Sequence, residues 1–501
     1  MTATERSKAS LSPGIGYAGL SFVTSAVIVL VNAIVTSRLY GVDVIGQYGL
    51  AITPWLVLVS LSTVSEQVAM IRALAHMPRG SDEATGLAFA VFTMSETLTA
   101  LMAIPVMVVS GIILHRQVGA RFSPWPAVVI VVGYVVFENV SWNMDSVLSA
   151  FNEGARMFWS RTATVVVFLV AAIALYPVTG SVWGLTIATV VSFATGLVAR
   201  LIAVRGLIGL WPHREHYTAG LHKLPDLLRY GLRLLPQQAF VGLTLQAPLW
   251  FIAGNATAAE IGAFSRASTM AQRLDEAAYR ANEMLFPDLV RMHLKNRLES
   301  FVSTLARTFR LALAGLLLAA ALGGGASEPL MNIFGKGFAA GAGALVFLLL
   351  AHVCFVACSM VGSAYNSYGK PQVNSAFGTI RFGVGLSLVV LLARYGITAA
   401  SAGLFVGYFL ELVVRVAMMH RILDLPGPVV ELGVVVRLLL AYSGGFAASR
   451  FVVMAVPGFA GLVLGLGAGF FVFVGLSLGT HLIDTHDRNA ILRRVKRLAR
   501  S

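Results

Sequence analysis

Residues 459–478 read FAGLVLGLGAGFFVFVGLSL, a stretch that contains no charged side chain. A helix of about 20 apolar residues has the length that is needed to cross a lipid bilayer. Similar apolar runs recur from end to end of the 501 residues, of which 57% are hydrophobic and 12% charged. Soluble domains carry about 25% charged residues, and no single soluble core could bury so many apolar runs. The sequence therefore predicts an all-α polytopic membrane protein.

Run length places about fourteen transmembrane helices along the chain. The expected spans are 13–37, 47–71, 85–113, 124–150, 157–177, 181–206, 230–253, 260–289, 303–325, 338–365, 372–394, 398–421, 432–454 and 458–483. Lysine and arginine gather in alternate loops and in the basic tail after residue 485, which marks one side of the membrane as cytoplasmic. We expect a multi-pass protein of the inner membrane with both termini in the cytoplasm. The same alternation explains the net charge of +14 without a nucleic-acid partner.

Two hairpins of the chain resemble each other. Residues 41–48 and 258–264 both place an Ile-Gly step, followed by one residue and an aromatic residue, where the chain re-enters the membrane. Six spans separate the hairpins, so the repeats have the same orientation, as in transporters built from parallel repeats. The basic connection 207–229 lies near the middle of the chain and is expected to be a cytoplasmic linker between the halves.

Five short stretches carry a family resemblance. They are RLYGVDVIGQYGLA at 38–51, EIGAFSRA at 260–267, NIFGKGF at 332–338, AYNSYGKP at 364–371 and YGITAA at 395–400. In order and spacing they resemble the polysaccharide transporter family of the multidrug/oligosaccharidyl-lipid/polysaccharide (MOP) exporter superfamily. This resemblance implies two pseudo-symmetric six-helix bundles around a central cavity, and two further helices. The corresponding parts are an N-terminal bundle at 1–206, the linker at 207–229, a C-terminal bundle at 230–424, helices thirteen and fourteen at 425–484, and a basic tail at 485–501.

The expected eighth span carries an unusual number of charges. It contains Arg266, Arg273 and Arg280, spaced by seven residues, which drift by only about 20° around a helix. The arginines should form one stripe, reaching about 21 Å along the helix. Guanidinium groups bind phosphate oxygens in pairs and stay charged, so this stripe suits a diphosphate headgroup. The alternatives are pairing within the helix to Glu276 and Glu283, and a helix lying on the cytoplasmic face.

Other polar residues of the expected spans are candidates for substrate or ion binding. In the first span Asn32 and Arg38 are further candidates for the cavity. The carboxyl groups of Glu66, Glu138, Asp145 and Glu276 are candidates for coupling transport to protons or sodium ions, because buried carboxyl groups can exchange protons. The alternative is that Glu138 and Asp145 pair with the arginines of the eighth span and hold the halves together.

Several residues are expected to be structural. Glu411 and Arg415 are one helical turn apart and are expected to pair. His352 stands alone in its expected span and is expected to be a hydrogen-bonded packing residue. Cys354 and Cys358 are expected to pack as thiols. Neither Gly-Lys pair of the chain has the spacing of a phosphate-binding loop, so no ATP site is predicted. We expect no cofactor and no metal.

The resemblance implies a flippase that moves polyprenyl-diphosphate-linked oligosaccharide from the inner to the outer leaflet by alternating access. Its expected partners are membrane lipids, H⁺ or Na⁺, and the glycosyltransferases or polymerase of a cell-surface polysaccharide pathway. Within the superfamily, a peptidoglycan-precursor flippase and a multidrug/cation antiporter remain alternatives. A membrane glycosyltransferase or polymerase is an alternative of another class, but the short outer loops leave no room for a catalytic domain. We therefore expect a transporter and not an enzyme, with a non-transporting scaffold as a last alternative.

Overall fold

The computed structural model describes residues 13–62, 70–71, 73–119, 122–209 and 211–482. Of these, the side chains at 13–26, 223, 226–238, 276–284, 287 and 371 are not described. The described residues are 87% helical, without a β-strand, and the chain groups into two compact units, residues 1–262 and 263–501. Eleven helices of the described part are long and apolar enough to cross a membrane. The protein is thus an all-α polytopic membrane protein, as predicted.

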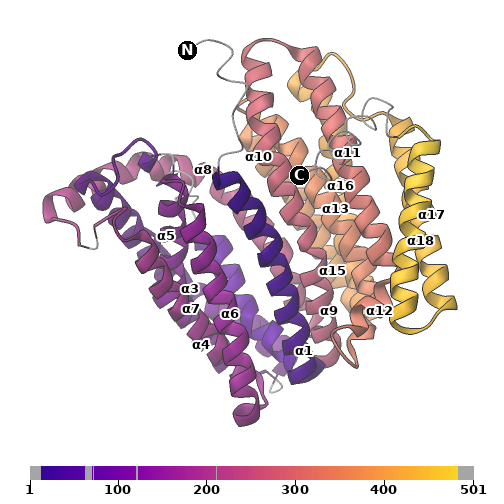
Figure 1. Ribbon diagram of the computed structural model, residues 1–501, viewed down its shortest axis with the longest axis horizontal. Coiled ribbons are helices and arrows are strands. Elements are labelled where there is room, and N and C mark those ends of the chain that lie inside the picture. The colour runs from indigo at the N-terminus through magenta and orange to yellow at the C-terminus, as the bar shows by residue number, and fades with distance from the viewer. Residues whose placement is uncertain (1–12, 63–69, 72, 120–121, 210, 483–501) are drawn as a thin grey trace. The chain divides into compact units, whose positions relative to one another are not determined.

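The first unit is built from helices, coloured indigo to magenta in Figure 1. They are α1 (Pro13–Ser62), α3 (Asp82–Val118), α4 (Trp125–Gly133), η3 (Tyr134–Glu138), α5 (Asn139–Ala150), α6 (Gly154–Thr179), α7 (Val182–Val204) and α8 (Arg214–Ile252). α1 covers the first expected span and most of the second. Gly41 lies between them and interrupts the helical course with φ of 77°, a conformation that glycine adopts without strain. α4, η3 and α5 follow one another directly and together form the span Trp125–Ala150.

The second unit begins inside α9 (Ala258–Ala271), at Ala263. Its further elements are α10 (Arg273–Leu294), α11 (Leu298–Gly325), α12 (Ser327–Asn332), η4 (Phe338–Gly341), α13 (Ala342–Ser367), α14 (Pro371–Ile380), η5 (Arg381–Gly385), α15 (Leu386–Leu392), η6 (Ala393–Tyr395), α16 (Ile397–Leu423), α17 (Leu432–Ala455) and α18 (Gly458–Gly479). α17 and α18 pack against each other and against α11. α13 is the most buried of the spanning helices and packs against α10, α11 and α16.

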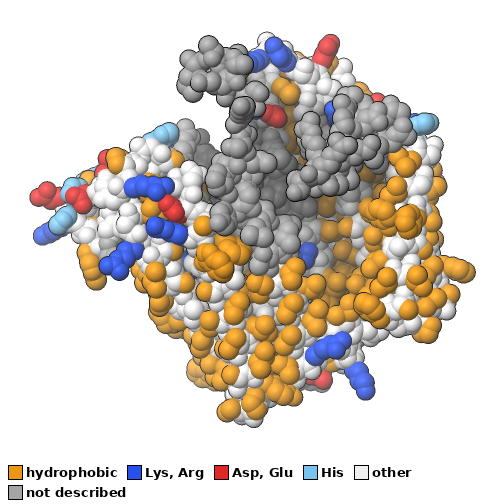
Figure 2. Space-filling model, in the orientation of Figure 1, with side chains coloured by type: hydrophobic (Ala, Val, Ile, Leu, Met, Phe, Trp, Pro, Cys, Tyr) orange, Lys and Arg blue, Asp and Glu red, His pale blue; other side chains and the backbone are white. Residues whose placement is uncertain are grey.

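The sides of the helices are apolar where they face outward. On the face shown in Figure 2, hydrophobic side chains cover the helix flanks, while lysine and arginine gather toward helix ends. Exposed large hydrophobic side chains on α3, α17 and α18 include Ile104, Phe451 and Phe471. Such surfaces are unfavourable in water and are solvated by the acyl chains of a bilayer, in agreement with a multi-pass membrane protein.

The connection between the sixth and seventh spans differs from an irregular linker. From Arg214 onward it is the first part of α8, continuous with the following span, and it packs against α3. Gly86 and Gly220 allow this approach, because a Cβ on either glycine would overlap the backbone of the other helix. The expected linker 207–229 thus lies within the first compact unit, and the expected domain division stays a prediction.

Candidate functional site

A cluster of buried charges lies inside the first unit, where η3, α5, α6 and α7 meet. Asp145 is its centre: Oδ1 accepts a hydrogen bond of 2.9 Å from Nε of Arg200, and Oδ2 accepts bonds from Nη2 of Arg200 at 3.2 Å and Nε of Arg161 at 3.0 Å. Arg200 is 3% exposed, whereas about half of the Arg161 side chain is accessible. Asp145 is therefore an ion-paired carboxylate held by two arginines of its own unit.

Glu138 lies at the edge of the same cluster. Its Oε1 accepts a hydrogen bond of 2.7 Å from Nε1 of Trp142, and its Oε2 lies 4.0 Å from Nη1 of Arg200. Neither Oε2 nor that Nη1 has a hydrogen-bond partner among the described residues. Glu138 is the last residue of η3, a π-helical turn, and such turns occur often at functional sites. The carboxyl group of Glu138 is thus buried beside a guanidinium group without bonding to it.

A second buried charge cluster lies inside the second unit. Glu411 is fully buried; its Oε1 lies 2.7 Å from Nη2 of Arg415, and its Oε2 lies 3.4 Å from Nη1 of Arg381. Arg415 also donates to Asn374, at 2.6 Å to Oδ1 and 3.1 Å to the carbonyl oxygen. The guanidinium of Arg381 lies 5.1 Å from the ring centroid of Tyr408, at cation–π distance. The predicted Glu411–Arg415 pair is therefore present, as part of a larger network.

The two clusters lie at corresponding places of the two units. Leu197-Val198-Ala199-Arg200 near the end of α7 matches Leu412-Val413-Val414-Arg415 of α16, and each arginine is buried against a carboxylate. Four residues before the arginine, α16 has Glu411 whereas α7 has Gly196. A Cβ at Gly196 would lie 2.7 Å from Nη1 of Arg200 and 3.3 Å from Oε2 of Glu138. Gly196 therefore leaves the space into which Glu138 reaches from η3.

The predicted stripe of arginines begins in α9 and continues in α10. Thr257 and Glu260 form a capping box at the start of α9, with hydrogen bonds of 2.8 Å and 3.2 Å between backbone and side chain. Gln272 joins α9 to α10 with φ of −59° and ψ of −18°, so the two helices are nearly continuous. Arg266 and Arg273 are partly exposed on them. The side chains of Arg280, Glu276 and Glu283 are not described, and Glu66 as a whole lies outside the described residues.

Asp275 of α10 has a buried hydrogen-bond partner on α13. Asp275 Oδ1 lies 2.7 Å from Nδ1 of His352 in α13, and both side chains are buried. The prediction of a hydrogen-bonded packing histidine is confirmed, and Asp275 is its partner. Sequence reasoning could not find this pair, because 77 residues separate its members.

The remaining candidates lie in α1 and α13. Asn32 is buried, and its Nδ2 donates 3.0 Å to the carbonyl oxygen of Val165 in α6, which directs its amide toward that helix. Arg38 is exposed near the kink at Gly41. Cys354 and Cys358 are free, buried thiols on α13, as predicted. Among the described residues, no group of three histidine, cysteine or acidic side chains could hold a metal ion.

From the sequence, Glu138 and Asp145 are expected either to exchange ions or to pair with arginines of the eighth span. For Asp145 the structure shows other partners. The arginines bound to Asp145 come instead from α6 and α7, because the carboxylate faces those helices within its own unit. Neither Arg200 nor Arg161 was recognised from the sequence as a partner. The repeated Leu-Val-x-Arg step is the signal that could have pointed to Arg200.

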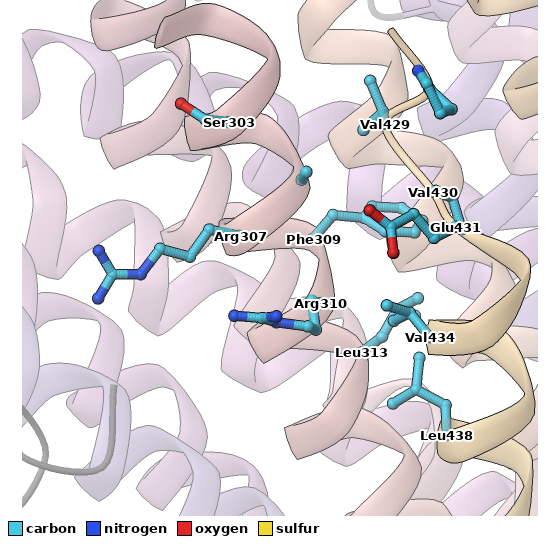
Figure 3. A pocket seen from close by; sticks show the side chains of 12 residues that line it. Ser303, Arg307, Phe309, Arg310, Leu313, Val429, Val430, Glu431, Val434 and Leu438 are labelled. Carbon is cyan, nitrogen blue, oxygen red and sulfur yellow. The ribbon is translucent and has the colours of Figure 1, made fainter. Parts of the chain in front are cut away.

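A cavity of about 340 Å³ lies between α11 and the start of α17. Figure 3 shows that Arg307 and Arg310 extend from α11 away from Val429 and Glu431, which lie on the opposite wall. The rest of the cavity lining consists largely of apolar side chains such as Phe309 and Leu438. The cavity thus has two guanidinium groups and one carboxylate on otherwise largely apolar walls.

Comparisons with solved structures find the same fold in membrane transporters. One is the lipid II flippase MurJ in an inward closed conformation, with a TM-score of 0.67 at 10% identity over 92% of this chain and 98% of that one. Another is an inward-facing multidrug resistance MATE family transporter of the MOP superfamily, with a TM-score of 0.65 at 15% identity over 79% of this chain and 94% of that one. A third is a MOP superfamily transporter from Pyrococcus furiosus, with a TM-score of 0.56 at 16% identity over 82% of this chain and 95% of that one. No protein-family model matches the chain, and no curated protein matches it.

Proposed function

We propose, on the premise that this chain has the fold of the MOP-superfamily transporters, that it is a flippase for lipid-linked oligosaccharides. It moves polyprenyl-diphosphate sugars from the inner to the outer leaflet of the inner membrane by alternating access. An ion gradient, H⁺ or Na⁺, drives the movement. The product supplies cell-surface polysaccharide synthesis, together with glycosyltransferases or a polymerase of the same pathway.

The observation that carries the substrate class is the arginine stripe on a nearly continuous helix. Arg266 and Arg273 lie on α9 and α10, and Arg280 follows seven residues later on α10. Three permanently charged guanidinium groups at this spacing suit an anionic headgroup and disfavour a cationic drug. Placing them against acyl chains would cost at least about 2.5 kcal/mol each, so we propose that they face a water-filled cavity. Arg38 and Asn32 are secondary candidates for the headgroup.

The experiment replaces each arginine of the stripe by alanine. Purified protein in proteoliposomes is given a short polyprenyl-diphosphate oligosaccharide, and a membrane-impermeant lectin reports which leaflet holds the sugar. We expect flipping to fall about tenfold or more in Arg266→Ala, Arg273→Ala and Arg280→Ala, which is ~1.4 kcal/mol or more of barrier. Arg297→Ala is the matched control, because Arg297 is an exposed arginine before α11. Unchanged flipping in all three stripe variants would refute the proposal.

A second candidate function is the flipping of a peptidoglycan precursor. It is supported by the similarity to the lipid II flippase, which extends over 98% of that chain. The same arginines would then bind the diphosphate of a different lipid, so the arginine variants do not separate the two candidates. A competition experiment separates them. Proteoliposomes are given the oligosaccharide lipid with excess lipid II, and loss of sugar flipping would favour the peptidoglycan precursor as the substrate.

A further inference from the structure

The hydrogen bonds around Arg200 are distributed unequally between its two acidic neighbours. Asp145 receives two hydrogen bonds from Arg200, at 2.9 Å and 3.2 Å, and a third from Arg161. Glu138, which is 5% exposed, receives none from Arg200, although the nearest atoms of the two groups are 4.0 Å apart. An ionised carboxylate buried beside a guanidinium group would be expected to bind it. The observed geometry therefore fits a protonated Glu138.

The surroundings of Glu138 permit a second arrangement of the same charges. Asp145 has Arg161 as a second partner, so it keeps one guanidinium if Arg200 leaves. The glycine at 196 leaves the path between Nη1 of Arg200 and Oε2 of Glu138 without a side chain. In the second unit this path does not exist, because Glu411 itself occupies the corresponding position and binds Arg415 directly.

We propose that Glu138 is a proton-binding site and that Arg200 exchanges between Asp145 and Glu138 as the proton leaves and returns. When the O–H bond of Glu138 breaks, the proton passes to water and the carboxylate remains. Arg200 then turns to Oε2 of Glu138, and Arg161 stays with Asp145. The cluster is positively charged by one unit with the proton bound and neutral without it. The inference rests on the proposed ion-driven function and names the residues that respond to the proton.

The elements around Glu138 place several charged and polar groups near it. α7 contributes Arg200, and α6 contributes Arg161 and the hydroxyl of Thr164 near the gap. α5 contributes Asp145 and the indole of Trp142. On α3, Glu96 accepts a bond of 2.7 Å from Asn139, the residue that follows Glu138. Arg200 is the described cation whose unbonded nitrogen lies nearest to the unbonded oxygen of Glu138.

The test is infrared difference spectroscopy of the full chain in lipid, recorded as the pH is raised. A protonated carboxyl band should disappear with rising pH and should be absent in Glu138→Gln. In Arg200→Gln the band should persist to a pH about one unit higher, a tenfold change in the protonated-to-ionised ratio, because the carboxylate loses its cation. Arg200→Lys retains the positive charge, so its band should disappear at a pH close to that of the native protein. No titrating band in the native protein, or none lost in Glu138→Gln, would overturn the proposal.

The exchange itself is tested with Asp145. In Asp145→Asn, Arg200 is released to Glu138, so the band should disappear at a lower pH than in the native protein. If this effect passes through Arg200, combining Asp145→Asn with Arg200→Gln should at least halve it. An effect of undiminished size in the double variant would mean that Asp145 acts on Glu138 through its own charge, and the exchange would be refuted.

Gly196→Ala tests the path without removing a charge. Its methyl group should separate Arg200 from Glu138 and reproduce the shift of Arg200→Gln. Gly111→Ala is the control, because a Cβ at that helical glycine would contact nothing within 4 Å. These measurements need no transported lipid, so the proton site can be refuted while the flippase proposal stands. Conversely, unchanged flipping in the arginine-stripe variants would refute the flippase proposal and leave the titration of Glu138 intact.

Discussion

Gly46 of α1 and Gly262 of α9 pack backbone against backbone. A Cβ at Gly46 would overlap the carbonyl oxygen of Ala258 and lie 3.0 Å from the amide nitrogen of Gly262. A Cβ at Gly262 would overlap the carbonyl oxygen of Val42 and lie 3.1 Å from the amide nitrogen of Gly46. These two glycines belong to the two Ile-Gly steps that mark the sequence repeat, so the repeated step is the place where the two hairpins touch.

Alanine at either glycine is expected to destabilise the protein. Gly46→Ala and Gly262→Ala each force the two backbones apart, and such overpacking costs typically about 1–3 kcal/mol. Thermal unfolding of the purified protein in detergent measures the effect, with Gly111→Ala as a helical glycine that has open space around it. A native melting temperature in both interface variants would contradict this close approach.

The helices could be predicted from the sequence because a bilayer restricts what can cross it. Apolar runs of about 20 residues must be helical, since the backbone finds no hydrogen-bond partners in lipid. The same reasoning missed the helical start of α8, where basic residues near the middle of the chain suggested a linker. Packing against α3 stabilises this segment as helix, and the glycines at 86 and 220 that allow the packing lie far apart in the chain.

The partners of the buried charges were only partly predictable. Glu411 and Arg415 lie on the same face of one helix, so their spacing predicts the pair. The partners of Asp145 are 16 and 55 residues away, and which of them it meets depends on how α5, α6 and α7 are rotated against one another. A π-helical turn such as η3 changes this rotation, and no spacing rule anticipates it.

Removing the carboxylate of Glu411 should be far more damaging than removing an exposed one. Glu411→Gln leaves Arg381 and Arg415 buried without their counter-ion, and breaking a buried pair in this way costs about 3–5 kcal/mol. Glu328→Gln is the matched control, because Glu328 pairs with Arg450 at 3.6 Å with both side chains substantially exposed. Exposed pairs contribute at most about 1 kcal/mol. Equal melting temperatures for the two variants would show that the buried network does not stabilise the fold.

The contact between Asp275 and His352 should connect α10 to α13 energetically. His352→Phe leaves the buried carboxyl of Asp275 without its partner, at an expected cost of about 1–3 kcal/mol. The control is His420→Phe, because His420 is exposed at the end of α16 and its loss should change little.

A double variant separates the hydrogen bond from simple packing. Replacing both partners, as in His352→Phe with Asp275→Leu, removes the unsatisfied group and can be nearly neutral. We therefore expect the double variant to unfold at a higher temperature than His352→Phe. If the two losses simply add, the residues do not interact, and α10 must be held against α13 by its apolar contacts.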